Sequence, residues 1–163
     1  MNPLKKLVGQ TAIYGLSSVI GRLLNYLLVP LYTRYFLPAE YGVVTEIYAY
    51  VAFLVIVLTY GLETAFFRFS QKDNDVKVVY STALISLIVS SIIFVILMFI
   101  SSSEIANWMG YAGHTEYIEW FAIIIALDAI SSISFAKLRA QNKAIRFAAI
   151  RLINIFFNIG LNI

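Results

Sequence analysis

The 163-residue sequence contains no cysteine, a single histidine and few charged residues. Without cysteine there can be no disulfide framework, which suits a protein with short outer loops. Metal-ligand spacing is absent, no glycine-rich phosphate loop is present, and the scattered serines have no histidine nearby to activate them. We therefore expect no catalytic residue, no metal site, no cofactor and no enzymatic activity, while a coupling ion, if one is used, is not identifiable.

The scarcity of charge points to a membrane. Only 13% of the residues are charged and 61% are hydrophobic, with a mean hydropathy of +0.83, whereas soluble domains carry about 25% charged residues. The stretch from Val78 to Ile100 contains no charged residue, and it matches the roughly 20 residues that span a hydrocarbon core. The sequence therefore predicts an all-α integral membrane protein.

Five apolar segments are long enough to be considered as membrane helices. They are residues 10–33, 41–67, 78–100, 117–136 and 147–163. At 1.5 Å of rise per residue the last of them covers only about 26 Å. We therefore expect residues 1–163 to form a partial N-terminal lobe of a larger transporter, truncated before a sixth helix, with a complete five-helix protein as the alternative.

The basic residues predict the orientation of these helices. Nine of the twelve fall on one side if the segments alternate across the membrane: Lys5, Lys6, Arg68, Lys72, Lys77, Lys137, Arg139, Lys143 and Arg146. Because positively charged loops stay in the cytoplasm, the N-terminus is predicted to be cytoplasmic and loops 34–40 and 101–116 to face outward. The same rule accounts for the basic residues, so nucleic-acid binding is not indicated.

Arg22 lies at the centre of the first segment, with its Cα about 18 Å from the polar residue at either flank. A guanidinium at that depth costs several kcal/mol if it faces lipid, so we expect it to face a cavity or a protein interior. Tyr14, Ser18 and Asn25 share its helical face. A purely structural ion pair is the alternative.

The fifth segment carries a second polar stripe. Arg151, Asn154 and Asn158 follow one another at helical spacing. Arg151 is five residues beyond Arg146, so its side chain could instead extend to the cytoplasmic interface. The two stripes together predict a cationic cavity with asparagines in its lining.

Two acidic residues are candidates for ion or proton coupling. Asp128 lies close to mid-membrane in the fourth segment, where a structural partner such as Arg22 or Arg151 is the alternative. Glu63 is shallower and within reach of Arg68, so an interfacial ion pair is its alternative. In the outer loop, apolar residues from Ile105 to Ala112 have the spacing of a short amphipathic helix, and His114 is expected to be a solvated loop residue.

Two stretches resemble a known family. The first, residues 15–69, reads GLSSVIGRLLNYLLVPLYTRYFLPAEYGVVTEIYAYVAFLVIVLTYGLETAFFRF, and the second, residues 138–155, reads LRAQNKAIRFAAIRLINI. Both resemble bacterial polysaccharide exporters of the multidrug/oligosaccharidyl-lipid/polysaccharide exporter superfamily. The resemblance implies a two-lobe bundle of twelve to fourteen helices around a central cavity that opens alternately to each side of the bacterial inner membrane.

The resemblance also implies a cargo, a polyprenyl-diphosphate-linked oligosaccharide that moves from the cytoplasmic to the periplasmic leaflet. Arg22 and Arg151 would then attract the diphosphate, with Asn25, Asn154 and Asn158 as polar lining. Expected partners are the lipid-linked oligosaccharide, membrane lipids, and a glycan polymerase with other assembly proteins. The alternatives are a cation-coupled drug or small-molecule antiporter, which would depend on Asp128 and Glu63, and a membrane subunit without transport activity.

Overall fold

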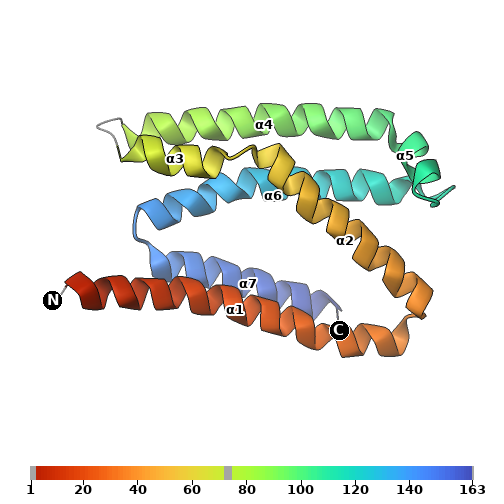
Figure 1. Cartoon of the computed structure of the whole chain (residues 1–163), viewed down its shortest axis with the longest axis horizontal. Coiled ribbons are helices and arrows are strands. Elements are labelled where there is room, and N and C mark those ends of the chain that lie inside the picture. The colour runs from red at the N-terminus through yellow and green to blue at the C-terminus, as the bar shows by residue number, and fades with distance from the viewer. Residues whose placement is uncertain (1–2, 72–74, 163) are drawn as a thin grey trace. The chain divides into compact units, whose positions relative to one another are not determined.

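The computed structural model describes residues 3–71 and 75–162, and every regular element in these two ranges is a helix. The helices are α1 (Pro3–Tyr35), α2 (Pro38–Thr59), α3 (Leu62–Ser70), α4 (Val76–Ile100), α5 (Ser102–Trp108), α6 (Thr115–Ala140) and α7 (Ala144–Asn162) (Figure 1). The helices α1, α4 and α6 are longer than the apolar segments predicted within them, because their ends continue through polar residues.

Three stretches of the described chain are long and apolar enough to cross a membrane: Tyr41–Ser70, Val76–Ile100 and Thr115–Ala140. They coincide with three of the five segments expected from the sequence, and the prediction of an all-α membrane protein is confirmed. Residues 10–33 and 147–162 form helices as well, within α1 and α7, and residue 163 of the fifth segment lies outside the described residues. Their membrane crossing, and the partial lobe formed by residues 1–163, stay predictions.

The chain divides into two compact units, and the first comprises residues 1–46 and 138–163. Its framework is the pair of helices α1 and α7, which pack against each other. Figure 1 shows that the two helices run in the same direction, each from the end that bears the N-terminus toward the end that bears the C-terminus. Two neighbouring helices that enter the membrane from the same side must run parallel, as α1 and α7 do.

The second unit comprises residues 47–137 and holds most of the residues that are buried among those whose side chains the structure describes. The helix α6 supplies the largest share: Ile118, Ala122, Ile125, Ala126, Ala129, Ile133 and Ala136. Their spacing of three and four residues places them along one face, the arrangement of a helix packed on its neighbours. Side-chain contacts attach α6 to the rest of the unit. The ring centroids of Tyr48 and Phe121 are 5.8 Å apart, and the hydroxyl oxygens of Tyr80 and Ser134 are hydrogen-bonded at 3.2 Å.

Polar and charged side chains reinforce the second unit near the start of α4. The ammonium group of Lys137 lies 3.6 Å from the centroid of the Tyr80 ring, within the range of a cation–π contact. On the other side of α4, the Tyr60 hydroxyl is hydrogen-bonded to Ser86. Ser90 and Ser132 bond to carbonyls of their own helices, at Leu87 and Ala129. These serines thus have structural roles within their unit.

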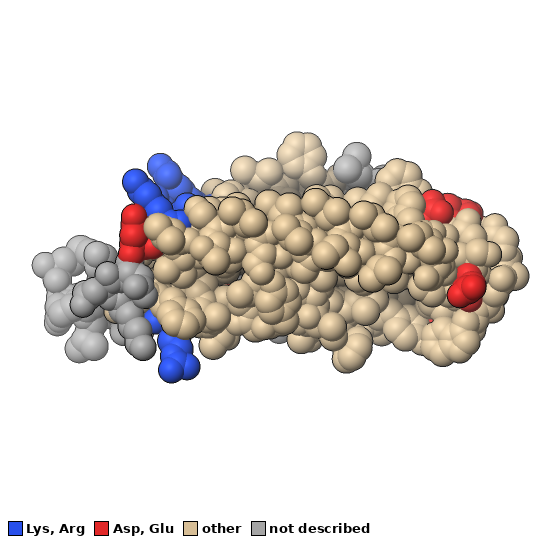
Figure 2. Space-filling view, turned by 90° about the horizontal axis from the view of Figure 1, so that it is seen from above, with Lys and Arg blue, Asp and Glu red and all other residues tan. Residues whose placement is uncertain are grey.

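The surface of the second unit has the distribution of charge that a membrane requires. Figure 2 looks onto the face over α4, where Lys and Arg gather at the end at which α4 begins and the long middle is largely free of charge. Large apolar side chains of α4 are more than half exposed, including Ile92, Ile96 and Leu97. An exposed apolar band of this kind is stable in lipid and not in water.

The second span expected from the sequence, residues 41–67, is interrupted in the structure. Between α2 and α3, Tyr60 has a φ of 34° and Gly61 a φ of 73°, both in the left-handed region. Two such residues end the α-helical hydrogen bonding, and α3 begins at Leu62. The apolar run continues without a break through this point, so the hydropathy pattern alone did not reveal the interruption.

We expect Gly61→Ala to lower the free energy of unfolding by about 1 kcal/mol, because alanine is strained at a positive φ. A Cβ at this position would meet no atom within 4 Å, so the cost is that of the backbone alone. Gly42→Ala is the matched control: Gly42 also has open space but lies within α2, where alanine should stabilise by up to about 1 kcal/mol. Thermal unfolding in detergent measures both, and equal effects in the same direction would contradict the assignment.

The loop between α4 and α6 contains the short helix expected from the sequence, but α5 ends at Trp108 and the spacing that continued to Ala112 does not persist as helix. Met109 follows as the C-cap, and Gly110, with a φ of 82°, then turns the chain. Ala106 is buried while Trp108 is 78% exposed. His114 is exposed, as expected, and its Nδ1 lies 2.9 Å from Oε1 of Glu116. An exposed tryptophan is common at a membrane surface.

Candidate functional site

The turn between α6 and α7 gives the first unit its cationic end. Asn142 has a φ of 55°, and its N–H donates to the carbonyl of Arg139 at 3.0 Å, while the N–H of Lys143 donates to the carbonyl of Leu138 at 3.0 Å. These two hydrogen bonds, with Asn142 in the left-handed conformation, form a Schellman motif. Asparagine tolerates this conformation better than most residues. The motif ends α6 and turns the chain sharply into α7.

This turn brings two arginines to the same aromatic ring. The guanidinium carbon of Arg139 lies 6.0 Å, and that of Arg151 5.1 Å, from the centroid of Phe147. Phe147 is only 3% exposed. From α1, the ring of Tyr14 meets Phe147 edge-on at 5.0 Å and an interplanar angle of 80°. We call Tyr14, Arg139, Phe147 and Arg151 the Phe147 cluster.

The ring contact between Tyr14 and Phe147 also fixes the register of the two parallel helices. Arg22 follows Tyr14 by eight residues and Ile155 follows Phe147 by eight, so both lie about 12 Å farther along the pair. By backbone position, Arg22 is therefore level with the part of α7 between Asn154 and Asn158. Arg151 lies about 6 Å nearer the start of the pair. The two arginines predicted to line a cavity thus occupy successive levels of one helix pair.

Some of the predicted cavity residues lie outside what the structure describes. The positions of Arg22, Asn25 and Asn158 are known only as parts of α1 and α7, and their side chains are outside the described residues. Of the remaining two, Arg151 and Asn154 are both exposed at the surface of the first unit. The structure therefore brings the two polar helices together, and the orientation of Arg22 stays a prediction.

The two acidic candidates belong to the second unit. Asp128 lies in the middle of α6 and is exposed, and Glu63 lies in the first turn of α3 and is half-buried. Within the described ranges, no group of three or more His, Asp or Glu residues is placed so that it could hold a metal ion. Pairing of Asp128 with Arg22 or Arg151 is not tested, since those residues belong to the other unit.

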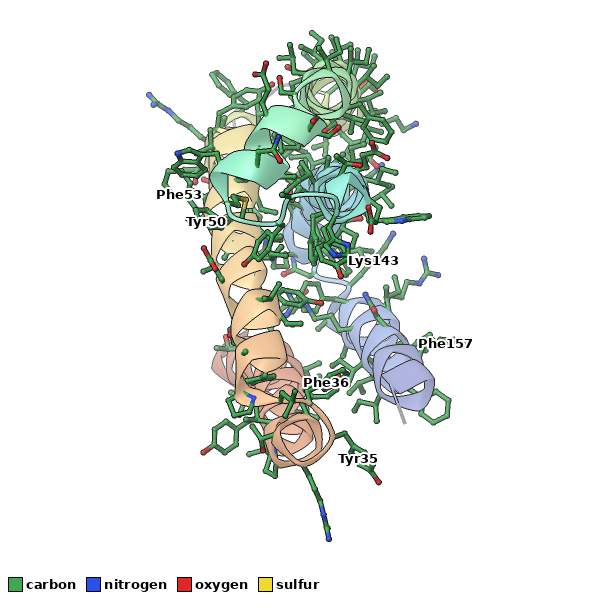
Figure 3. All side chains as sticks on the ribbon, turned by 90° about the vertical axis from the view of Figure 1, so that its right-hand side faces the viewer. Tyr35, Phe36, Tyr50, Phe53, Lys143 and Phe157 are labelled. Carbon is green, nitrogen blue, oxygen red and sulfur yellow. The ribbon has the colours of Figure 1, made fainter. Side chains whose placement is uncertain are left out.

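The helix pair α1 and α7 exposes large apolar side chains. Phe157 projects away from α7, and Tyr35 and Phe36 project from the end of α1 (Figure 3). Phe156 and Phe157 are 75% and 61% exposed. Together with exposed Leu16 and Leu23 on α1, they provide surface suited to lipid or to further helices. The pair therefore has both an apolar exterior and a line of polar residues.

Sequence reasoning missed Arg139 and Phe147 as parts of this site. Arg139 was fully explained as a cytoplasmic loop residue by the positive-inside rule, and Phe147 as an ordinary apolar residue of the fifth segment. The available signal was the Gln141-Asn142 pair between two helical patterns, because asparagine is favoured at the left-handed position that ends a helix.

The fold and the site together define the class. All described elements are helices, three stretches of the described chain are long and apolar enough to span a membrane, and polar residues recur at helical spacing along α1 and α7. This is an all-α integral membrane protein. Residues 31–163 match the model of a family described as "Polysaccharide biosynthesis protein". The chain belongs to this polysaccharide biosynthesis family, and the resemblance inferred from the sequence is confirmed.

The matched range has a consequence for the site. It includes Arg139, Arg151, Asn154 and Asn158 and begins nine residues after Arg22. Comparisons with curated proteins and with solved structures gave no match. Membership of the family therefore covers the Phe147 cluster except for Tyr14, while the role of Arg22 depends on physical reasoning and on its place in α1.

Proposed function

We propose that the protein is a flippase, which carries a polyprenyl-diphosphate-linked oligosaccharide from the cytoplasmic to the periplasmic leaflet of the bacterial inner membrane by alternating access. Membership of the polysaccharide biosynthesis family supports a role in making or exporting a glycan. The observation that carries the transport proposal is the packing of α1 against α7, two helices with an arginine in each. In this proposal the protein translocates its cargo and catalyses no covalent step.

The chemistry of such a cargo explains why arginines would be needed. A diphosphate carries at least two negative charges, and leaving water costs several kcal/mol unless opposite charge replaces the hydration. Arginine stays charged in an apolar environment and presents two parallel donors to phosphate oxygens. Arg151 and then Arg22, about 6 Å apart along the helix pair, would offer successive positions for the diphosphate. Asn25, Asn154 and Asn158 would bind the adjoining polar groups.

The orientation follows from the same proposal. The Phe147 cluster would lie on the cytoplasmic side, where the lipid-linked unit is made, and α5 on the periplasmic side. A glycan polymerase and other assembly proteins would receive the cargo there. Partner lipids would cover the apolar exterior of α4 and of the helix pair.

Removal of the protein from cells tests the proposal. We expect depletion to cause lipid-linked oligosaccharide to accumulate in the cytoplasmic leaflet while the sugar transferases remain active, since only translocation would be lost. The measurement is the amount of lipid-linked unit extracted from membranes, with its accessibility to a sugar-cleaving enzyme added outside spheroplasts. A normal amount of periplasmic glycan after depletion would rule out the flippase. Loss of drug resistance with unchanged glycan would instead favour the antiporter, in which Asp128 and Glu63 would be the candidates for ion or proton coupling.

Cysteine labelling tests the orientation, and residues 1–163 supply no native cysteine as background. We expect Asn107→Cys to react with a membrane-impermeant maleimide in intact cells and Gln71→Cys to react only after permeabilisation. Both residues are exposed, one in α5 and one directly after α3, so access to the reagent should differ only through the membrane. Labelling of Gln71→Cys in intact cells would reverse the proposed topology.

A further inference from the structure

A groove of about 490 Å³ lies between α3 and α4, which pack against each other within the second unit (Figure 1). Pockets that bind small ligands have volumes of roughly 300–1,000 Å³. Ala65 of α3 and Ala83 of α4 are among the lining residues, and such short side chains leave space that larger ones would fill. None of the lining residues belongs to the α1–α7 pair, so the groove is separate from the candidate site described above.

Polar groups follow the α4 wall of the groove from one end to the other. Asp75, Thr82 and Ser86 line it and are spaced by seven and four residues, which places them along one helical face. At the inner end, the hydroxyl of Ser86 is hydrogen-bonded to that of Tyr60. The charged group lies at the other end, about 16 Å away along the helix axis. The groove thus has a carboxylate at its mouth and a satisfied polar pair at its inner end.

The middle of the groove is apolar and accessible from the bilayer. Phe66 and Phe69 line it from α3 and Val78 lines it from α4. The side chains of Phe69 and Val78 are 48% and 62% exposed. Since Val78 lies in the candidate span Val76–Ile100, lipid rather than water surrounds this opening. An apolar lining does not retain water, so the natural occupant is a hydrocarbon chain supplied by the membrane.

The charges near the mouth indicate the head group of that lipid. Asp75 is the N-cap of α4 and accepts the N–H of Lys77 at 2.9 Å, and a carboxylate has lone pairs for further donors. Exposed cations follow on both helices, Arg68 in the last turn of α3 and Lys77 in the first turn of α4. Within the described ranges, neither Asp75 nor Lys77 forms an ion pair. One anion with cations beside it complements a zwitterionic head group.

We propose that the groove between α3 and α4 binds one acyl chain of phosphatidylethanolamine, with the ammonium group of the lipid on Asp75 at the membrane surface. A primary ammonium has three N–H donors for the carboxylate, whereas the quaternary ammonium of phosphatidylcholine has none. An anionic lipid would bring a second negative charge to Asp75. The ligand is a component of the bilayer and not the cargo, so this site goes beyond the proposed function and does not depend on it.

Photolabelling of the full-length protein in detergent tests the site. The probe is phosphatidylethanolamine with a diazirine in one acyl chain, and mass spectrometry of peptides gives the place and yield of attachment. We expect attachment to α3 and to the first half of α4. Thr82→Trp should lower the yield at least about fivefold, because the indole would fill the groove. Ser81→Trp is the matched control: Ser81 is an exposed hydroxyl residue beside Thr82 that does not line the groove, so the yield should change less than about twofold.

Asp75→Asn tests the head group separately, since asparagine keeps the helix cap and removes the charge. Unlabelled lipids compete with the probe for the native protein and the variant. For the native protein, phosphatidylethanolamine should compete at about threefold lower concentration than phosphatidylcholine, the effect of one exposed ion pair. The preference should disappear in Asp75→Asn. Glu104→Gln removes an exposed carboxylate from α5 and should leave the preference unchanged.

The results that would overturn the site are distinct. Unchanged yield in Thr82→Trp, equal loss in Ser81→Trp, or attachment outside the groove would exclude an acyl chain there. Equal competition by the two lipids would exclude the contact with Asp75, and stronger competition by polyprenyl phosphate would assign the groove to an isoprenoid instead. Should Thr82→Trp fail to fold, Val78→Trp decides, because Val78 lines the groove from an exposed position. Normal glycan after depletion, with labelling retained, would remove the flippase and leave this site standing.

Discussion

Arg22→Ala is expected to reduce glycan export at least about tenfold, the effect of removing charge-assisted hydrogen bonds worth roughly 1.5–3 kcal/mol. The reason is the depth of the residue: its place in α1 is two turns beyond the contact between Tyr14 and Phe147. In the predicted membrane-spanning α1 this level lies near the centre of the bilayer, where few water molecules would replace a missing positive charge. Arg22→Lys should retain intermediate export, because lysine keeps the charge and loses the paired donors.

The measurement is periplasmic glycan in cells that produce each variant at equal abundance in place of the native protein. Arg34→Ala is the control, since Arg34 is an exposed arginine in the last turn of the same helix. It should leave export within about twofold of normal, as expected for a screened surface charge. Normal export by Arg22→Ala would exclude a role in cargo binding. Failure of both Arg22→Ala and Arg22→Lys to fold would point to a structural role.

The same helix pair explains why one part of the site could be predicted and another could not. The stripes with Arg22 and Arg151 are periodic along a helix, so their faces can be assigned from spacing alone. The periodicity within each helix does not predict that α1 packs on α7, since more than a hundred residues separate Tyr14 from Phe147. Arg139 joins Phe147 only because the turn at Asn142 has a particular geometry. Sequence reasoning therefore found the polar residues of each helix and missed the contacts of Phe147 with Tyr14 and Arg139.

The fold shows a similar division. Helices were predictable because a lipid-spanning segment must satisfy its backbone internally and be apolar for about 20 residues. Hydropathy did not show the interruption at Tyr60 and Gly61, because the uncharged run from Ile47 to Leu62 continues through both residues. It also could not tell that Trp108 would be exposed and Ala106 buried in α5. Such details depend on which neighbours cover each face, and a single sequence does not specify the neighbours.

Ala129→Phe is expected to lower the free energy of unfolding by about 3 kcal/mol, the upper part of the usual range for overpacking a filled interior. Ala129 is 0% exposed, and it lies at the centre of the buried face of α6 between Ala126 and Ile133. A phenyl ring there must displace side chains that are already in contact. Leu127→Phe adds a ring to the same helix at a position that is 59% exposed, where a change of less than about 0.5 kcal/mol is expected.

Thermal unfolding of the two variants in one detergent compares these positions directly, because the added side chain is the same and only its direction differs. The exposed position should accept the ring, since lipid or detergent tails rearrange around it at little cost. The buried position should not, because α6 is held on both sides, by Tyr48 through Phe121 and by Tyr80 through Ser134. Equal stability of the two variants would mean that the face with Ala129 is not packed in the protein.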